Sequence, residues 1–220
     1  TFGGPVATPG MDRLAASGLR YNNFHVTALC APTRAALFTG RNDHRVGFGT
    51  VPESASRHPG YDGVWPDSAA SIAQVLKIHG YSTAAFGKWH NTPYWEVSPV
   101  GPFERWPTGR GFEYFYGFMA GAMDHFDPVL WRNTTRVEPP RSAKEGYNLG
   151  SDLTDEALAW LDTQRALAPG KPWLLYYAPG ATHEPHQPPR EWIAQYRGRF
   201  DAGWDALRAI KPDLILARQN

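Results

Sequence analysis

The stretch that decides the fold reads Cys30-Ala31-Pro32-Thr33-Arg34-Ala35-Ala36-Leu37-Phe38-Thr39-Gly40-Arg41. Proline suits the first turn of a helix and glycine suits the position after the last, so we predict a helix from Pro32 to about Phe38 that ends at Gly40. Cys30 would then lie at the helix N-terminus, where free N–H groups favour an anion. Arg34, one turn onward, carries a planar fork that matches two oxygens of a tetrahedral oxyanion. The five residues alone are also compatible with a buried structural cysteine.

The pattern Cys-x-Pro-x-Arg, followed by Thr-Gly-Arg, resembles the signature of the type I sulfatases. Three further segments resemble that family in the same order along the chain: Thr8 to Ala15, Phe86-Gly87-Lys88-Trp89-His90, and Gly180 to His186. Residues 101–107 and 112–118 resemble its bacterial arylsulfatase branch. The resemblance covers nearly the whole chain. It implies an α/β fold, a partial alkaline phosphatase-like sandwich with a mostly parallel sheet flanked by helices.

The resemblance also implies a mechanism. A formylglycine-generating enzyme would oxidise Cys30 to formylglycine, an aldehyde whose hydrate attacks a small-molecule sulfate ester such as an aryl sulfate. Arg34 and Lys88 would hold the modified side chain, His90 would act as a base, and His183 would act as an acid. Lys88 and His183 would also contact the sulfate. A calcium ion would polarise a sulfate oxygen, with residue 30, as formylglycine, among its ligands.

Several metal ligands of that family have no match in this sequence. It contains neither the Asp-Asp pair nor the later Asp-Asn pair, and no evident match to a late sulfate-binding lysine. We therefore expect residues 1–220 to form a single partial sulfatase catalytic domain, incomplete at both ends. The first metal-binding strand and the C-terminal part would be missing, the remaining metal ligands would lie outside this chain, and the isolated fragment would be inactive. Residues 210–220 follow the family pattern poorly.

The composition is that of an ordinary globular chain, with 42% hydrophobic and 20% charged residues. A net charge of +1 gives no field that would attract nucleic acid or anionic lipid. No apolar run approaches the length of a membrane span. A single cysteine cannot form an internal disulfide. We expect neither a nucleic-acid nor a membrane partner, and a cytoplasmic or periplasmic location in a bacterium.

Apolar periodicity and turn residues predict an alternation of helices and strands. We expect helices over 8–18, 68–79 and 153–168, and strands over 19–26, 81–86 and 173–178. The last strand is wholly apolar, which is typical of a buried parallel strand. Residues 42–66 read as a long loop, and residues 91–150 show little periodicity.

In open α/β sheets, ligands collect at the carboxyl ends of the strands. Cys30 follows the strand expected to end near Val26, Lys88 and His90 follow the one near Phe86, and His183 follows the one near Ala178. Three strand exits would thus deliver polar groups to one edge. Period-two spacing would place Lys88 and His90 on one side of an extended backbone, with Trp89 opposite.

Two alternatives to sulfate ester hydrolysis stay open. A phosphonate or phosphate ester hydrolase would use the same nucleophile, because both chemistries share a tetrahedral oxyanion. A non-catalytic chain would result if the missing metal ligands are not supplied. Of the remaining histidines, we expect five to be structural or exposed. His186 is a candidate pocket residue, and His44, although it is one of the five, is a weaker candidate. The five are His25, His44, His58, His79 and His125.

Overall fold

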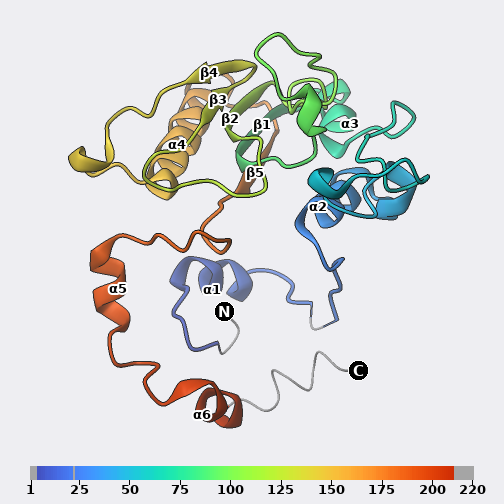
Figure 1. Ribbon diagram of the computed structural model, residues 1–220. Coiled ribbons are helices and arrows are strands. Elements are labelled where there is room, and N and C mark those ends of the chain that lie inside the picture. The colour runs from blue at the N-terminus through green and yellow to red at the C-terminus, as the bar shows by residue number, and fades with distance from the viewer. Residues whose placement is uncertain (1–3, 22, 211–220) are drawn as a thin grey trace. The chain divides into compact units, whose positions relative to one another are not determined.

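The computed structural model describes residues 4–21 and 23–210 (Figure 1). Contacts in space between backbone positions divide the chain into two compact units. The larger comprises residues 27–193, and the smaller combines the segments before and after it, residues 1–26 and 194–220. The expectation of a single partial catalytic domain stays a prediction.

The larger unit is built on one five-stranded sheet with the order β4-β3-β2-β1-β5. Strands β1, β2 and β5 run parallel, and the hairpin β3–β4 adds two antiparallel strands next to β2. The bounds are β1 Ser82–Lys88, β2 Tyr114–Phe118, β3 Leu130–Arg132, β4 Thr135–Val137 and β5 Trp173–Ala178. A mostly parallel sheet with helices around it confirms the predicted α/β class.

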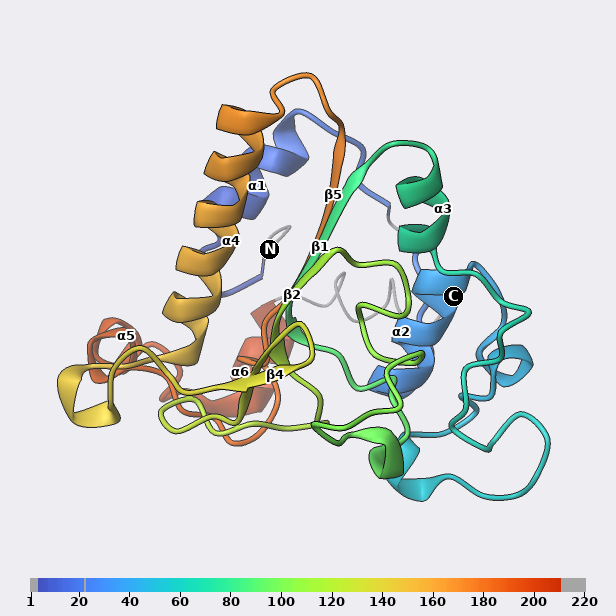
Figure 2. The same ribbon diagram turned by 90° about the horizontal axis from the view of Figure 1, so that it is seen from above.

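Helices cover both faces of this sheet. Figure 2 shows α4 (Leu149–Leu167) on one side and α2 (Cys30–Thr39) with α3 (Ile72–Ile78) on the other. The core is divided into two clusters, one on each face of the sheet, because successive side chains along a strand point to opposite faces. Ala85 packs in the cluster that contains the α2 and α3 residues, whereas Ala84 packs in the cluster that contains the α4 residues.

Strand β1 is buried along its whole length and lies very close to both neighbours. A Cβ atom on Gly117 would lie 2.0 Å from the Gly87 carbonyl oxygen, and one on Gly87 would lie 2.3 Å from the Ala178 carbonyl oxygen. Gly87 also has a φ of 96°, which favours glycine. These glycines bring three strands together where β1 ends at Lys88.

Helix α2 begins at Cys30, after an extended Leu29, two residues before the predicted start at Pro32. Its last residue is Thr39 and Gly40 caps it in the left-handed conformation, so the predicted end is confirmed. Helix α3 starts at Ile72 rather than near Ser68. The reason is the capping box of Ser71 and Gln74, which satisfies the N-terminal amides from position 71. Short 3-10 turns occupy Asp43–Val46, Pro52–Ser54, Tyr94–Glu96 and Ala143–Glu145.

The structure differs from the sequence predictions for strands in three places. Residues 19–21 and 23–26 form no strand: their apolar side chains, such as Leu19 and Phe24, are exposed and have no neighbouring strand to pair with. The region 91–150, without visible periodicity, contains β2, β3 and β4. Strand β5 is parallel as expected but forms an edge of the sheet, so Trp173 and Tyr177 are 47% and 39% exposed.

The smaller unit contains α1 (Pro9–Ala16) and α6 (Gly203–Ile210), while α5 (Arg190–Tyr196) crosses the boundary between the units. Helix α1 follows Thr8 and has Pro9 in its first turn, as predicted, although the Thr8 side chain makes no capping bond. Among the described residues, no helix is both long and apolar enough to cross a membrane.

Candidate active site

Cys30 and His90 meet although 60 residues separate them in the sequence: the Cys30 Sγ atom lies 3.2 Å from His90 Nδ1. Cys30 is the first residue of α2, and His90 follows β1 by two residues. The His90 backbone has a φ of 59°, and its N–H donates to the Met119 carbonyl. This turn out of the strand directs the imidazole ring toward the start of α2.

Lys88 is the last residue of β1 and is almost fully buried. Burial lowers the pKa of its ammonium group, the nearby Arg34 lowers it further, and Cys30 opposes the shift. Trp89 points away, into the aromatic core, where it stacks on Trp65. Lys88 and His90 therefore lie on the same side, as predicted, although the backbone is not extended at His90.

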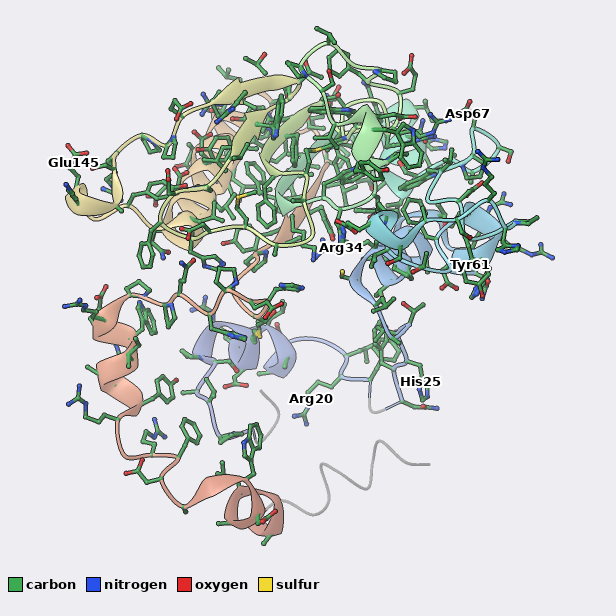
Figure 3. All side chains as sticks on the ribbon, viewed as in Figure 1. Arg20, His25, Arg34, Tyr61, Asp67 and Glu145 are labelled. Carbon is green, nitrogen blue, oxygen red and sulfur yellow. The ribbon has the colours of Figure 1, made fainter. Side chains whose placement is uncertain are left out.

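Arg34 extends from α2 to the sheet (Figure 3). Its Nη1 donates to the Lys88 carbonyl at 2.9 Å and to the Tyr176 hydroxyl at 2.6 Å. In the part of the chain that the structure describes, its buried Nε has no hydrogen-bond partner. Burial raises the pKa of Tyr176, which keeps the phenol neutral beside the guanidinium. Arg34 and Lys88 together make the surroundings of Cys30 favourable for an anion.

Burial also lowers the pKa of His90, and Glu53 opposes this shift without cancelling it. The imidazole is therefore neutral near pH 7. A neutral histidine can accept a proton from a group at position 30.

The place of His183 in this cluster stays a prediction. It lies in the loop after β5 and is exposed, and its Nδ1 lies 2.8 Å from the Glu184 carbonyl oxygen. No hydrogen bond or ion pair connects it with the other four candidates among the described residues. No strand precedes Cys30 among the described residues, so Cys30 reaches His90 from the start of α2 and not from a strand exit.

The loop that carries His183 is tied to the loop after β2. Gln187 donates to Asp124 Oδ2 and accepts from the His125 backbone N–H, each at 2.8 Å. His125 is buried, as a structural histidine would be, and burial lowers the pKa of its ring. His186, one residue before Gln187, is exposed.

His44, the weaker pocket candidate, belongs to a different set of contacts. Its ring lies 3.2 Å from Asp43 Oδ1 and 3.0 Å from the Tyr61 hydroxyl. These contacts close the long loop 42–66 on itself, so they account for His44 without a role at Cys30.

Glu53, like Tyr176, is a residue at this site that sequence reasoning missed. It lies in the 3-10 turn Pro52–Ser54, and its carboxylate oxygens lie 3.0 and 2.9 Å from His90 Nε2. Burial alone would raise the pKa of Glu53, but the hydrogen bond with His90 and other contacts outweigh it and lower the pKa. The only sequence signal was its place in a long loop, since such loops often line sites.

A pocket of about 300 Å³ opens beside this pair. Its lining comes from the turn that carries Glu53, the segment after β1 and the segment after β2. The lining residues are Pro52, Glu53, His90, Thr92, Tyr94, Val97, Met119 and Ala120.

The described residues do not supply a metal site of their own. Among them, no group of three or more histidine, cysteine, aspartate or glutamate side chains is placed to hold an ion. Near Cys30, the carboxylate of Glu53 is engaged by His90, and Lys88 and Arg34 are cations. The calcium site implied by the resemblance therefore does not fit the described residues alone.

Comparison with known proteins decides the family. The sulfatase family model matches residues 1–219. The chain belongs to the sulfatase family. Members generally use a formylglycine and a metal ion. An uncharacterized sulfatase of Schizosaccharomyces pombe is 31% identical and aligns with 100% of this chain and 42% of its own length. The arylsulfatase of Klebsiella aerogenes is 28% identical over 92% of this chain and 44% of its own length.

Solved structures place the sulfatase chain in the alkaline phosphatase-like fold. The protein yidJ from Bacteroides fragilis superposes with a TM-score of 0.68 at 22% identity, over 95% of this chain and 45% of that one. BT4656, solved with its substrate D-glucosamine-2-N,6-O-disulfate, gives a TM-score of 0.63 at 25% identity, over 89% and 33%. The sulfatase chain thus spans less than half the length of these relatives.

Proposed function

We propose that this sulfatase chain forms part of the catalytic domain of a sulfuric ester hydrolase, which converts an aryl sulfate to a phenol and sulfate. The observation that carries the proposal is the contact of Cys30 with the neutral His90, beside the cations of Arg34 and Lys88. Formylglycine at position 30, made by a formylglycine-generating enzyme, would supply a hydrated aldehyde as nucleophile.

The chain's own residues would divide the remaining work. Arg34 and Lys88 would offset the negative charge of the ester and hold the side chain at position 30. His90 would accept a proton through Nδ1, the atom that faces Cys30. His183 would contact the sulfate on the leaving-group side, supported by its place in a loop that Gln187 ties to the segment after β2.

We propose that the metal is calcium and that most of its ligands come from outside this chain. Carboxylates are the usual ligands of calcium, and the described residues offer no suitable group of them. We retain a cytoplasmic or periplasmic location, and a small-molecule sulfate ester as the partner, as parts of the same proposal.

Two other substrate classes follow from particular observations. The bound D-glucosamine disulfate of BT4656 favours a sulfated sugar as a second candidate. A phosphate or phosphonate ester is a third, because the cations near Cys30 would attract any tetrahedral oxyanion.

The test compares rates of the full-length protein on 4-nitrophenyl sulfate, a sulfated glucosamine, 4-nitrophenyl phosphate and an aryl phosphonate. The proposal expects the highest kcat/KM on the aryl sulfate and loss of turnover in Cys30→Ala. A higher kcat/KM on the sulfated sugar would support the second candidate. A higher kcat/KM on the phosphate or the phosphonate would contradict sulfatase activity.

A further inference from the structure

The carboxylate of Glu53 holds the far side of the His90 ring. Both of its oxygens lie within 3.0 Å of Nε2, while Nδ1 on the opposite side faces Cys30 Sγ at 3.2 Å. The imidazole of His90 thus lies between the Glu53 carboxylate and Cys30, the residue that would be oxidised to formylglycine. This is the geometry in which an acid fixes the tautomer and orientation of a catalytic histidine.

The chemistry of the two partners assigns the ring hydrogen. An ionised carboxylate can only accept hydrogen bonds, so Nε2 must carry the hydrogen that Glu53 receives. In a neutral imidazole the other nitrogen is then the acceptor. The lone pair of Nδ1 consequently points at residue 30.

The ring has little freedom to adopt another arrangement. A Cβ atom on Gly121 would lie 2.8 Å from His90 Cε1 and 3.5 Å from Glu53 Oε1, so only glycine leaves room for the ring and carboxylate there. The His90 backbone N–H is bonded to the Met119 carbonyl. Glu53 is the side chain that pairs with Nε2.

The simplest competing interpretation is that Glu53 and His90 form an exposed ion pair with a negligible effect on stability or function. The Glu53 side chain is 54% exposed, and such pairs contribute little. The His90 side chain, however, is 5% exposed. Removing the carboxylate would leave a buried N–H without a protein acceptor, which costs more than the loss of a surface charge.

We propose that Glu53 is a positioning residue that holds His90 in the Nε2–H tautomer and aims Nδ1 at residue 30. In this role Glu53 acts through His90. The role in turnover rests on the sulfatase function proposed above, whereas the tautomer of His90 does not.

Histidine-selective ¹⁵N NMR of the full-length protein tests the tautomer directly, with the His90 resonances assigned from His90→Gln. At pH 7.5 we expect a protonated Nε2 and an unprotonated Nδ1 in the wild type, and a mixture of tautomers in Glu53→Ala. Glu104→Ala removes an exposed glutamate elsewhere in the same unit and should leave the signals unchanged. A protonated Nδ1 in the wild type, or an unchanged tautomer in Glu53→Ala, would overturn the proposal.

Kinetics provide the second measurement. Glu53→Ala should lower kcat on 4-nitrophenyl sulfate on the order of tenfold to a hundredfold, with KM changed less than about threefold, because a misdirected base affects the chemical step. Glu53→Gln keeps an acceptor oxygen and should recover most of kcat. Equal losses in the two variants, or a loss confined to KM, would contradict positioning. If the wild type hydrolyses no sulfate ester, the proposed function fails while the NMR result still decides the inference.

Discussion

Arg34 and Tyr176 join the helix that begins at Cys30 to the edge strand of the sheet, through a hydrogen bond of 2.6 Å between Nη1 and the phenol oxygen. The Tyr176 ring also packs edge-on against Phe38 of α2, with centroids 4.8 Å apart. One tyrosine thus contributes both to the core and to the placement of a proposed catalytic arginine. The fold and the site share this contact.

Tyr176→Phe is expected to keep the ring packing and remove the acceptor for Arg34. A hydrogen bond to a charged group contributes about 1.5–3 kcal/mol, so we expect the free energy of unfolding to fall by about that amount. Substrate affinity should fall as well, because the guanidinium is less well held. Urea unfolding and KM on an aryl sulfate are the measurements.

Tyr21→Phe is the matched control, because Tyr21 is 74% exposed. Its unfolding free energy and KM should equal those of the wild type. Identical behaviour of the two phenylalanine variants would show that the Tyr176 hydroxyl does not support Arg34.

Acid should destabilise the fold through two buried histidines. Burial lowers the pKa of both His90 and His125 below the ordinary value of 6.5, so the unfolded chain binds protons more readily. The free energy of unfolding should therefore rise as the pH increases from the pKa of each histidine in the folded state to 6.5, and it should level off above pH 6.5. The slope should be at most about 1.4 kcal/mol per pH unit for each histidine.

Urea unfolding between pH 5 and 8 measures this dependence, and His125→Gln should reduce the slope below pH 6.5. An equal slope in the variant and the wild type would contradict the assignment to His125. Glu53 acts in a separate window: its lowered pKa adds stability above pH 4.5 that is lost as the pH falls through the folded value.

Gln187→Ala should loosen the loop that carries His183. The variant loses the bond to Asp124 and the acceptor for the His125 N–H. Each bond contributes about 1 kcal/mol, so hydrogen–deuterium exchange of residues 180–189 should quicken about tenfold or more. Gln195→Ala, at an exposed glutamine of α5, is the control. Unchanged exchange in Gln187→Ala would mean that other contacts hold the loop.

The 220-residue chain alone should turn over aryl sulfates far more slowly than the full-length protein. The described residues provide no metal site, and the proposed calcium ligands lie elsewhere. Parallel assays with added calcium are the measurement. Comparable kcat/KM values for the two proteins would contradict the expectation that turnover needs calcium ligands from outside the 220-residue chain.

Local sequence signals predicted those parts of the fold that depend on neighbouring residues. Pro32 and Gly40 marked α2, and the run 173–178 marked β5, because caps and apolar runs act within a few residues. The burial of β5 could not be predicted, since it depends on which strands lie beside it. The segment 19–26 resembles a strand in composition but lacks a partner in the described structure.

The same distinction holds for the site. Cys30, Lys88 and His90 were found from short motifs, and the structure brings them together. Glu53 and Tyr176 reach the site from a loop and a strand with no motif, so only the tertiary structure identifies them. The position of His183 relative to Cys30 stays a prediction.

The chemical state of residue 30 tests the central claim most directly. Peptide mass spectrometry of the Cys30 peptide, from protein made in its own host, distinguishes a thiol from an aldehyde. If the protein is a formylglycine-dependent sulfatase, we expect a carbonyl oxygen in place of the Cys30 thiol. An unmodified thiol that reacts fully with an alkylating reagent would contradict the account and leave Cys30 as a structural residue.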